Sequence, residues 1–276
     1  MPRGNQFRTR MSAAVLILVA LAAPLPGRAV EPTAAAVAGF NTYMTALESR
    51  IDRQHQSKDN FVASVLSDPG NLVKLKRGET IIERLTPADG PALPGAMLHH
   101  WRGTAFVPGA KLADFERLME DFAGYPKSFA PQIVQAKVLT RKDEAGRTSI
   151  QTVMRVKQRH VITVVMDTAY DVVFARLDAQ HGYSISRSTK ISEISGAGTK
   201  DEHPMSRADE HGFLWRLDTY WSYEERDRGL YIQIESVSLT RSIPAGLGWA
   251  LKPFIESVPR ESLEFTLQAA SNALKK

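Results

Sequence analysis

Residues 212–244 read GFLWRLDTYWSYEERDRGLYIQIESVSLTRSIP, and they contain the clearest pattern of paired strands in the chain. Between Phe213 and Tyr223 the odd positions are mostly apolar or aromatic and the even positions mostly polar. This alternation is typical of a strand with one buried face. A second run of strand-forming residues covers 229–242, and the turn-like Asp227-Arg228-Gly229 lies before it. The pattern therefore predicts a β-hairpin that presents a row of large side chains to a core.

The turn sets the register of this hairpin. We expect a three-residue loop with Gly229 in the left-handed conformation. A shift of one residue would send every side chain of one strand to the other face. The predicted pairs are Arg226 with Leu230, Trp221 with Glu235, Thr219 with Val237, Leu217 with Leu239 and Trp215 with Arg241.

This register places two charged side chains, Glu235 and Arg241, on the face that carries the tryptophans. Charged groups on an apolar face are costly unless they are paired or hydrogen-bonded. Six residues along one strand separate them by roughly 20 Å, so they cannot pair with each other. Each needs a partner on a neighbouring strand or on a ligand, and a register error of one residue would place both on the opposite face.

The rest of the chain supplies more strands and a closing helix. Short turns between consecutive runs predict an antiparallel sheet. In the longest run, 161–177, alternate residues point to opposite faces. The sequence leaves open whether Val161, Thr163 and Val165 or Ile162, Val164 and Met166 face inward. The seven predicted strands are 97–107, 132–141, 147–158, 161–177, 182–195, 212–225 and 229–242.

Helices are predicted at both ends of this region. Leu112 begins an amphipathic helix, and residues 125–131 (YPKSFAP) are expected to form a loop. After Pro244 we expect a short helix over 246–257 and a longer one with Pro259 at its first position. An amphipathic helix that arrives last must bury its apolar face on the sheet. That face holds Leu263, Leu267, Ala270 and Leu274.

This order of elements resembles the START and birch-pollen-allergen superfamily, the α+β helix-grip fold, over residues 96–276. Three passages carry the resemblance: LMEDFAGYPKSFAPQIVQAKVL (118–139), residues 212–244 and ESVPRESLEFTLQAASNAL (256–274). The first is similar to polyketide-cyclase-like and coenzyme-Q-binding members. The resemblance implies a curved seven-stranded antiparallel sheet around a long C-terminal helix, with a cavity between them for a hydrophobic small molecule.

The first 95 residues divide into two parts. Residues 1–29 have a basic start, an apolar run and a small-residue exit, which predict a signal peptide cleaved after Ala29. We therefore expect an exported protein, periplasmic or secreted. Residues 30–95 are expected to form a helical extension with an amphipathic helix over 32–56 and a second helical piece at 61–66, ended by the turn at Asp68-Pro69-Gly70. A transient contact of this extension with a membrane surface stays open.

Composition excludes several classes of function. The 276 residues carry a net charge of +5, but residues 1–29 hold four arginines and no acid, which leaves 31 basic and 30 acidic residues. This balance, without a basic and aromatic surface, argues against nucleic-acid binding. The chain has no cysteine and hence no disulfide or thiolate chemistry. No phosphate loop, dinucleotide fingerprint or zinc motif occurs, so neither a cofactor nor a metal is predicted. An acidic loop flanked by His203 and His211 is expected to be solvated.

These observations favour a binding or carrier protein and leave an enzyme as the alternative. An enzyme of the cyclase, dehydratase or hydrolase type would use Glu235 with Tyr223 or Arg241 as acid-base groups, because burial raises the pKa of a carboxyl group. The sequence does not specify an oligomeric state. The expected ligand-binding residues are Trp215, Leu217, Thr219, Trp221, Tyr223, Glu235, Val237, Leu239, Arg241, Leu263 and Leu267.

Overall fold

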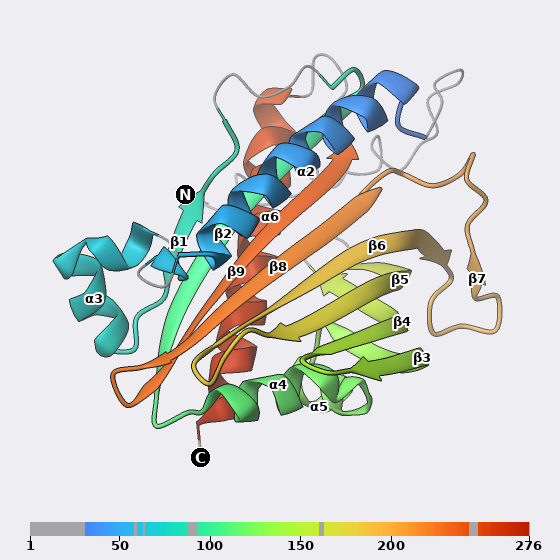
Figure 1. Ribbon diagram of the computed structural model, residues 1–276. Coiled ribbons are helices and arrows are strands. Elements are labelled where there is room, and N and C mark those ends of the chain that lie inside the picture. Colours follow the sequence, from blue (N-terminus) through green and yellow to red (C-terminus); the bar gives the residue numbers. More distant parts are fainter. Residues whose placement is uncertain are drawn as a thin grey trace, which may run out of the picture.

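The computed structural model describes residues 31–57, 60–62, 64–87, 93–159, 163–242 and 248–275. The predicted signal peptide lies outside the described residues. The described chain is α+β, with one large curved antiparallel sheet and helices on both faces. Helix α6 (Gly248–Leu274) lies on one face and helix α2 (Ala34–His55) on the other (Figure 1). This is the helix-grip architecture, and we call the two sides the α6 face and the α2 face.

The predicted strands are all present. Neighbouring strands lie across the sheet in the order β1-β2-β9-β8-β6-β5-β4-β3, and β7 pairs with β6. The described sheet has nine strands instead of the seven predicted, because β1 adds an edge strand beside β2 and the short β7 pairs with the end of β6. The strands are β1 (Ile81–Arg84), β2 (Ala96–Pro108), β3 (Ile133–Glu144), β4 (Arg147–Arg159), β5 (Thr163–Arg176), β6 (His181–Ser195), β7 (His203–Pro204), β8 (Arg216–Arg226) and β9 (Gly229–Arg241).

The register of the β8–β9 hairpin differs from the prediction by one residue. Asp227 and Arg228 both have φ of 57°, and Arg226 pairs directly with Gly229. The connection is thus a two-residue turn, whose twist matches that of the flanking strands. The Asp227 carboxylate supports this turn because it accepts a 2.9 Å hydrogen bond from the hydroxyl of Tyr231. The predicted pairs of Trp221 with Glu235, Thr219 with Val237, Leu217 with Leu239 and Trp215 with Arg241 are therefore wrong.

Helix α6 packs against the centre of its face. Among its described residues the buried apolar side chains are Leu263, Leu267, Ala270 and Leu274, as predicted. The helix approaches β2 closely at Gly103, where an added Cβ would lie 2.7 Å from the Cδ2 of Leu263. The prediction of two helices with a break before Pro259 is wrong, because α6 continues through that residue. Loss of one backbone donor at a proline does not end this helix.

Helix α2 covers the opposite face. The side chain of Thr33 caps its start by accepting a hydrogen bond from the backbone N–H of Ala36. The apolar stripe of α2 is buried against Tyr220, Val237 and Leu239. This stripe consists of Ala36, Phe40, Met44, Leu47 and Ile51.

Shorter helices complete both faces. The 3-10 helix η2 (Ser64–Ser67) and helix α3 (Pro69–Lys76) follow α2. The predicted turn at Asp68-Pro69-Gly70 in fact begins α3, because Asp68 caps it and Pro69 takes the first helical position. On the α6 face lie α4 (Leu112–Glu120), η3 (Phe122–Gly124) and α5 (Tyr125–Ser128). The predicted loop 125–131 thus begins with a turn of helix.

Candidate functional site

The one-residue change of register divides the predicted ligand-binding residues between the two faces. Leu217, Trp221 and Tyr223 join Leu263 and Leu267 in the core cluster on the α6 face, and Thr219 lies on the same face by strand alternation. Trp215, Val237 and Leu239 instead pack with α2. Alternation along β9 places Glu235 and Arg241 on this second face.

The α6 face has a packed half and a half-exposed part. Near α4 the side chains of Trp221, Tyr223 and Ile232 are buried in the core. Two residues further along the strands, one row crosses β2, β9, β8 and β6 as Trp101, Ser236, Thr219 and Ser186. All four side chains of this row, and Leu217 beside it, are only half-buried. Although α6 crosses this face of the sheet, the row retains exposed surface.

Three members of this row were not among the predicted ligand-binding residues: Trp101, Ser186 and Ser236. They lie 135 positions apart at most in the sequence, and only strand pairing brings them together. One signal was present in β6, where serines alternate as Ser184, Ser186 and Ser188. Such small hydroxyl side chains on an inward face leave room that larger residues would fill.

For β5 the even positions Tyr170, Val172 and Phe174 face α6, which places Met166 on that side as well.

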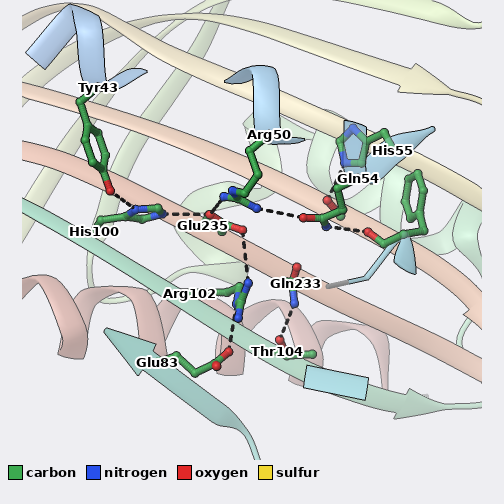
Figure 2. Close-up of polar contacts among 12 residues, drawn as sticks. Tyr43, Arg50, Gln54, His55, Glu83, His100, Arg102, Thr104, Gln233 and Glu235 are labelled. Carbon is green, nitrogen blue, oxygen red and sulfur yellow. Dashed lines mark hydrogen bonds and ion pairs between the residues drawn. The ribbon is translucent and has the colours of Figure 1, made fainter. Parts of the chain in front are cut away.

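Glu235 lies on the α2 face in a buried polar cluster (Figure 2). It accepts a hydrogen bond from Arg50 of α2 and a 2.9 Å bond from the Nε2 of His100. The Nη1 of Arg102 lies 3.9 Å from its other oxygen, and Arg102 in turn contacts Glu83 at 2.9 Å. Burial by itself raises the pKa of Glu235, but the bond from His100 and the charge of Arg50 outweigh it and lower the pKa to about 2. The carboxylate is therefore ionised at neutral pH.

The same cluster links α2 to β2 and β8. The hydroxyl of Tyr43 lies 2.7 Å from the Nδ1 of His100, so Tyr43, His100 and Glu235 form one hydrogen-bonded chain (Figure 2). His55, at the end of α2, contacts the hydroxyl of Ser222 at 2.7 Å. Burial lowers the pKa of His55 to about 4, so this imidazole is neutral at pH 7. The cluster holds α2 on the sheet through charged and neutral groups that satisfy one another.

The structure does not bring the three acid-base candidates together. The hydroxyl of Tyr223 is on the α6 face, 3.3 Å from the carbonyl oxygen of Tyr183. Glu235 is on the other face of the sheet, and Arg241 ends β9, where its N–H donates to the carbonyl of Gly212. Glu235 therefore shares no site with Tyr223, which is on the opposite face, nor with Arg241, which lies roughly 20 Å further along the same strand.

The histidines of the acidic loop have protein partners. The Nδ1 of His211 lies 2.8 Å from Glu193, which also accepts bonds from the N–H groups of residues 211–213. The Nδ1 of His203 contacts the carbonyl of Asp201 at 2.7 Å. Within the described ranges, no group of three His, Asp or Glu side chains is placed to hold a metal ion. No helix of the described chain combines the length and apolar character needed to cross a bilayer.

The chain is similar to several solved structures at low sequence identity. The STAR-related lipid transfer protein of Xanthomonas axonopodis is 13% identical, with 71% of this chain and 99% of that chain covered and a TM-score of 0.42. Human STARD10 is 8% identical, covers 69% of each chain and has a TM-score of 0.43. The ZhuI aromatase/cyclase of Streptomyces sp. R1128 is 14% identical, with 64% and 88% covered and a TM-score of 0.35.

The sequence comparisons give no further relative. No family model matches the chain, and no curated protein matches it. These three structures are below 15% in identity and below 0.5 in TM-score, so they carry no functional conclusion. The START-like helix-grip fold is defined by the sheet order and the closing helix of this chain. Any function must be argued from its own side chains.

Proposed function

We propose that this chain is an exported protein that binds a hydrophobic small molecule between the sheet and α6. One observation carries the proposal. On the same strands, Thr219 and Ser236 on the α6 face are half-buried, whereas Tyr220 and Val237 on the α2 face are 2% and 0% exposed. One face is thus sealed by its helix, and the other retains exposed apolar and hydroxyl surface beneath its helix.

The driving force for such binding is burial of apolar surface. Trp101, at one end of the half-buried row, and Leu217, beside the row, offer apolar area to a ligand. A ligand that removes about 200 Å² of apolar surface from water gains about 5 kcal/mol. Small-molecule sites of this kind are mostly apolar with a few polar groups that orient the ligand. The row supplies those groups as neutral hydroxyls.

The experiment fills the proposed ligand space between the sheet and α6 with a larger side chain. The purified protein is extracted with organic solvent and the extract analysed by mass spectrometry, for the wild type and for Ser186→Trp. Ser186 faces α6, so the indole of the variant should occupy the ligand space and reduce the extracted compound at least tenfold. Ser192→Trp is the matched control, because Ser192 lies on the same strand opposite Asp167 and points to the other face.

Two results would contradict the proposal. One is a wild-type protein that releases no hydrophobic compound and whose tryptophan fluorescence does not respond to any lipid-like probe. The other is equal ligand content in Ser186→Trp and the wild type. Export is tested separately by N-terminal sequencing of the protein from a secreting host, which should begin at Val30. A product that retains residues 1–29 would remove export from the proposal and leave ligand binding intact.

A further inference from the structure

Five hydroxyl side chains gather on the α6 face at the centre of the sheet. Ser186 of β6 pairs with Thr219 of β8, and Thr219 pairs with Ser236 of β9. Side chains of directly paired residues lie about 5 Å apart at their Cβ atoms. Ser184 and Ser238 lie two residues along their strands on the same face. We call these five residues the hydroxyl patch.

The hydroxyls of the patch have no partner among the described residues. Ser184 and Ser238 are nevertheless 3% and 4% exposed. Within the described chain, every fully enclosed side-chain oxygen or nitrogen has a hydrogen-bond partner. The hydroxyl oxygens of these two buried serines must therefore border accessible space on the α6 face. A buried hydroxyl without a partner costs free energy, which a ligand that hydrogen-bonds to it would recover.

Other hydroxyls on the same face are used within the protein. The Thr152 hydroxyl donates to the carbonyl of Lys137, and the Thr168 hydroxyl donates to that of Met154. The Ser188 oxygen accepts from the N–H of Leu217. The patch is thus set apart from ordinary strand serines and threonines by its free donors and acceptors.

The side chains next to the patch are mostly apolar. Trp101 lies beside Ser236, Val172 beside Ser186, and Trp221 beside Ser184. The imidazole of His99, beside Ser238, is buried and contacts the hydroxyl of Thr240 at 3.0 Å. Among the described residues that pair with the patch on neighbouring strands, the side chains are therefore apolar or hydrogen-bonding, without a carboxylate, an ammonium or a guanidinium group.

The charged residues nearest in these strands, Asp218 and Glu235, point to the α2 face. An anionic or cationic group at the patch would lose its hydration without gaining a counter-charge from the described strand residues beside it. A neutral group loses far less, and a hydroxyl can both donate to it and accept from it.

From this arrangement we infer that the ligand is a neutral amphiphile whose oxygen-bearing polar group, a hydroxyl or a carbonyl, hydrogen-bonds to the hydroxyl patch. The inference rests on the proposed function and narrows its ligand class. Fatty-acid anions and cationic amphiphiles are disfavoured because the described strand residues beside the patch include no carboxylate, ammonium or guanidinium group. Specificity then resides in Ser186, Thr219 and Ser236, which lie side by side across three strands.

The test uses three probes that share an alkyl chain of the same length and differ in the charge of the polar group: dodecan-1-ol, dodecanoate and dodecyltrimethylammonium. Their dissociation constants are measured at pH 8 from tryptophan fluorescence of the full protein. The wild type should bind the alcohol at least tenfold more tightly than either ion. The triple variant Ser186→Ala, Thr219→Val and Ser236→Ala should lose about tenfold in affinity for the alcohol and little for the ions, since one neutral hydrogen bond is worth roughly a factor of five. Ser192→Ala, on the other face, should bind all three probes like the wild type.

The outcomes separate this inference from the proposed function. Tighter binding of an ion than of the alcohol, or an unchanged affinity of the triple variant for the alcohol, overturns the neutral-ligand inference while ligand binding itself stands. Failure of all three probes to bind overturns the inference, and if solvent extraction also releases no hydrophobic compound, the proposed function fails with it. If the triple variant unfolds, the single variant Thr219→Val serves as the test, because valine has nearly the same shape as threonine. Its affinity should fall about fivefold for the alcohol and stay unchanged for the ions.

Discussion

Glu235→Gln removes the charge at the centre of the polar cluster under α2 and keeps the shape of the side chain. The pKa of Glu235 is lowered from 4.5 to about 2 in the folded protein. A pKa difference of one between the folded and unfolded chains corresponds to about 1.4 kcal/mol, so ionisation of this one carboxylate stabilises the fold by about 3 kcal/mol at pH 7. The side chain is only 4% exposed, so solvent screening does not reduce this value much. The variant should therefore unfold with a free energy about 3 kcal/mol lower than the wild type.

The pH dependence makes the prediction specific. A carboxyl whose folded pKa is depressed contributes stability above its unfolded pKa and loses it as the pH falls through the folded value. The difference between wild type and Glu235→Gln should therefore be full above pH 4.5 and shrink towards pH 2. Urea denaturation followed by tryptophan fluorescence at pH 7 and pH 3 measures both values.

A matched control is Glu144→Gln. Glu144 is ion-paired with Lys142, but its side chain is 53% exposed, and exposed pairs of this kind often contribute nothing measurable. Its urea midpoint should equal that of the wild type. A loss below about 1 kcal/mol in Glu235→Gln at pH 7, or a loss that does not shrink on acidification, would refute the reasoning that the carboxylate charge holds α2 on the sheet.

Three further predictions concern other parts of the structure. Because burial lowers the pKa of His55 to about 4, stability should fall as the pH drops from 6.5 to 4, and His55→Gln should flatten this part of the curve of unfolding free energy against pH; equal slopes would argue against a buried neutral imidazole. Gly103→Val should cost about 1–3 kcal/mol in urea denaturation, because its side chain would collide with Leu263 and Leu267, and an unchanged midpoint would mean that α6 lies further from β2. Arg228→Gly should raise the unfolding free energy by about 1 kcal/mol, because Arg228 has φ of 57°, where glycine avoids the steric cost; a destabilised variant would contradict the two-residue turn.

Local patterns predicted the strands well. The hydrophobic alternation between residues 132 and 242 indicated six strands whose ends agree with β3, β4, β5, β6, β8 and β9 to within a few residues. The final helix and its buried leucines were predicted from helical spacing. These features depend on side chains close together in sequence, and for this reason local reasoning reaches them. Pro259 misled the same reasoning, because a proline can begin a helix or lie within one.

The candidate site was predicted only in part. Leu217, Thr219 and Trp221 were expected to face the final helix, and they do. Glu235 was expected beside them and lies on the other face, because the turn has two residues and not three. The energies of the two turn types differ by little, yet the choice reverses the face of every residue of β9 relative to β8.

Hydrophobic patterns along the chain were enough to predict its elements, their order and an antiparallel sheet that must bury a closing helix. They did not predict which side chains meet in the folded protein. Trp101 and Ser236 are distant in sequence and become neighbours through strand pairing, and Arg50 reaches Glu235 only because α2 folds back over the sheet. Hydrophobic alternation indicates that a strand has two different faces, but it does not indicate which helix covers each face. The covering helix is set by packing between segments distant in sequence, which a local pattern does not contain.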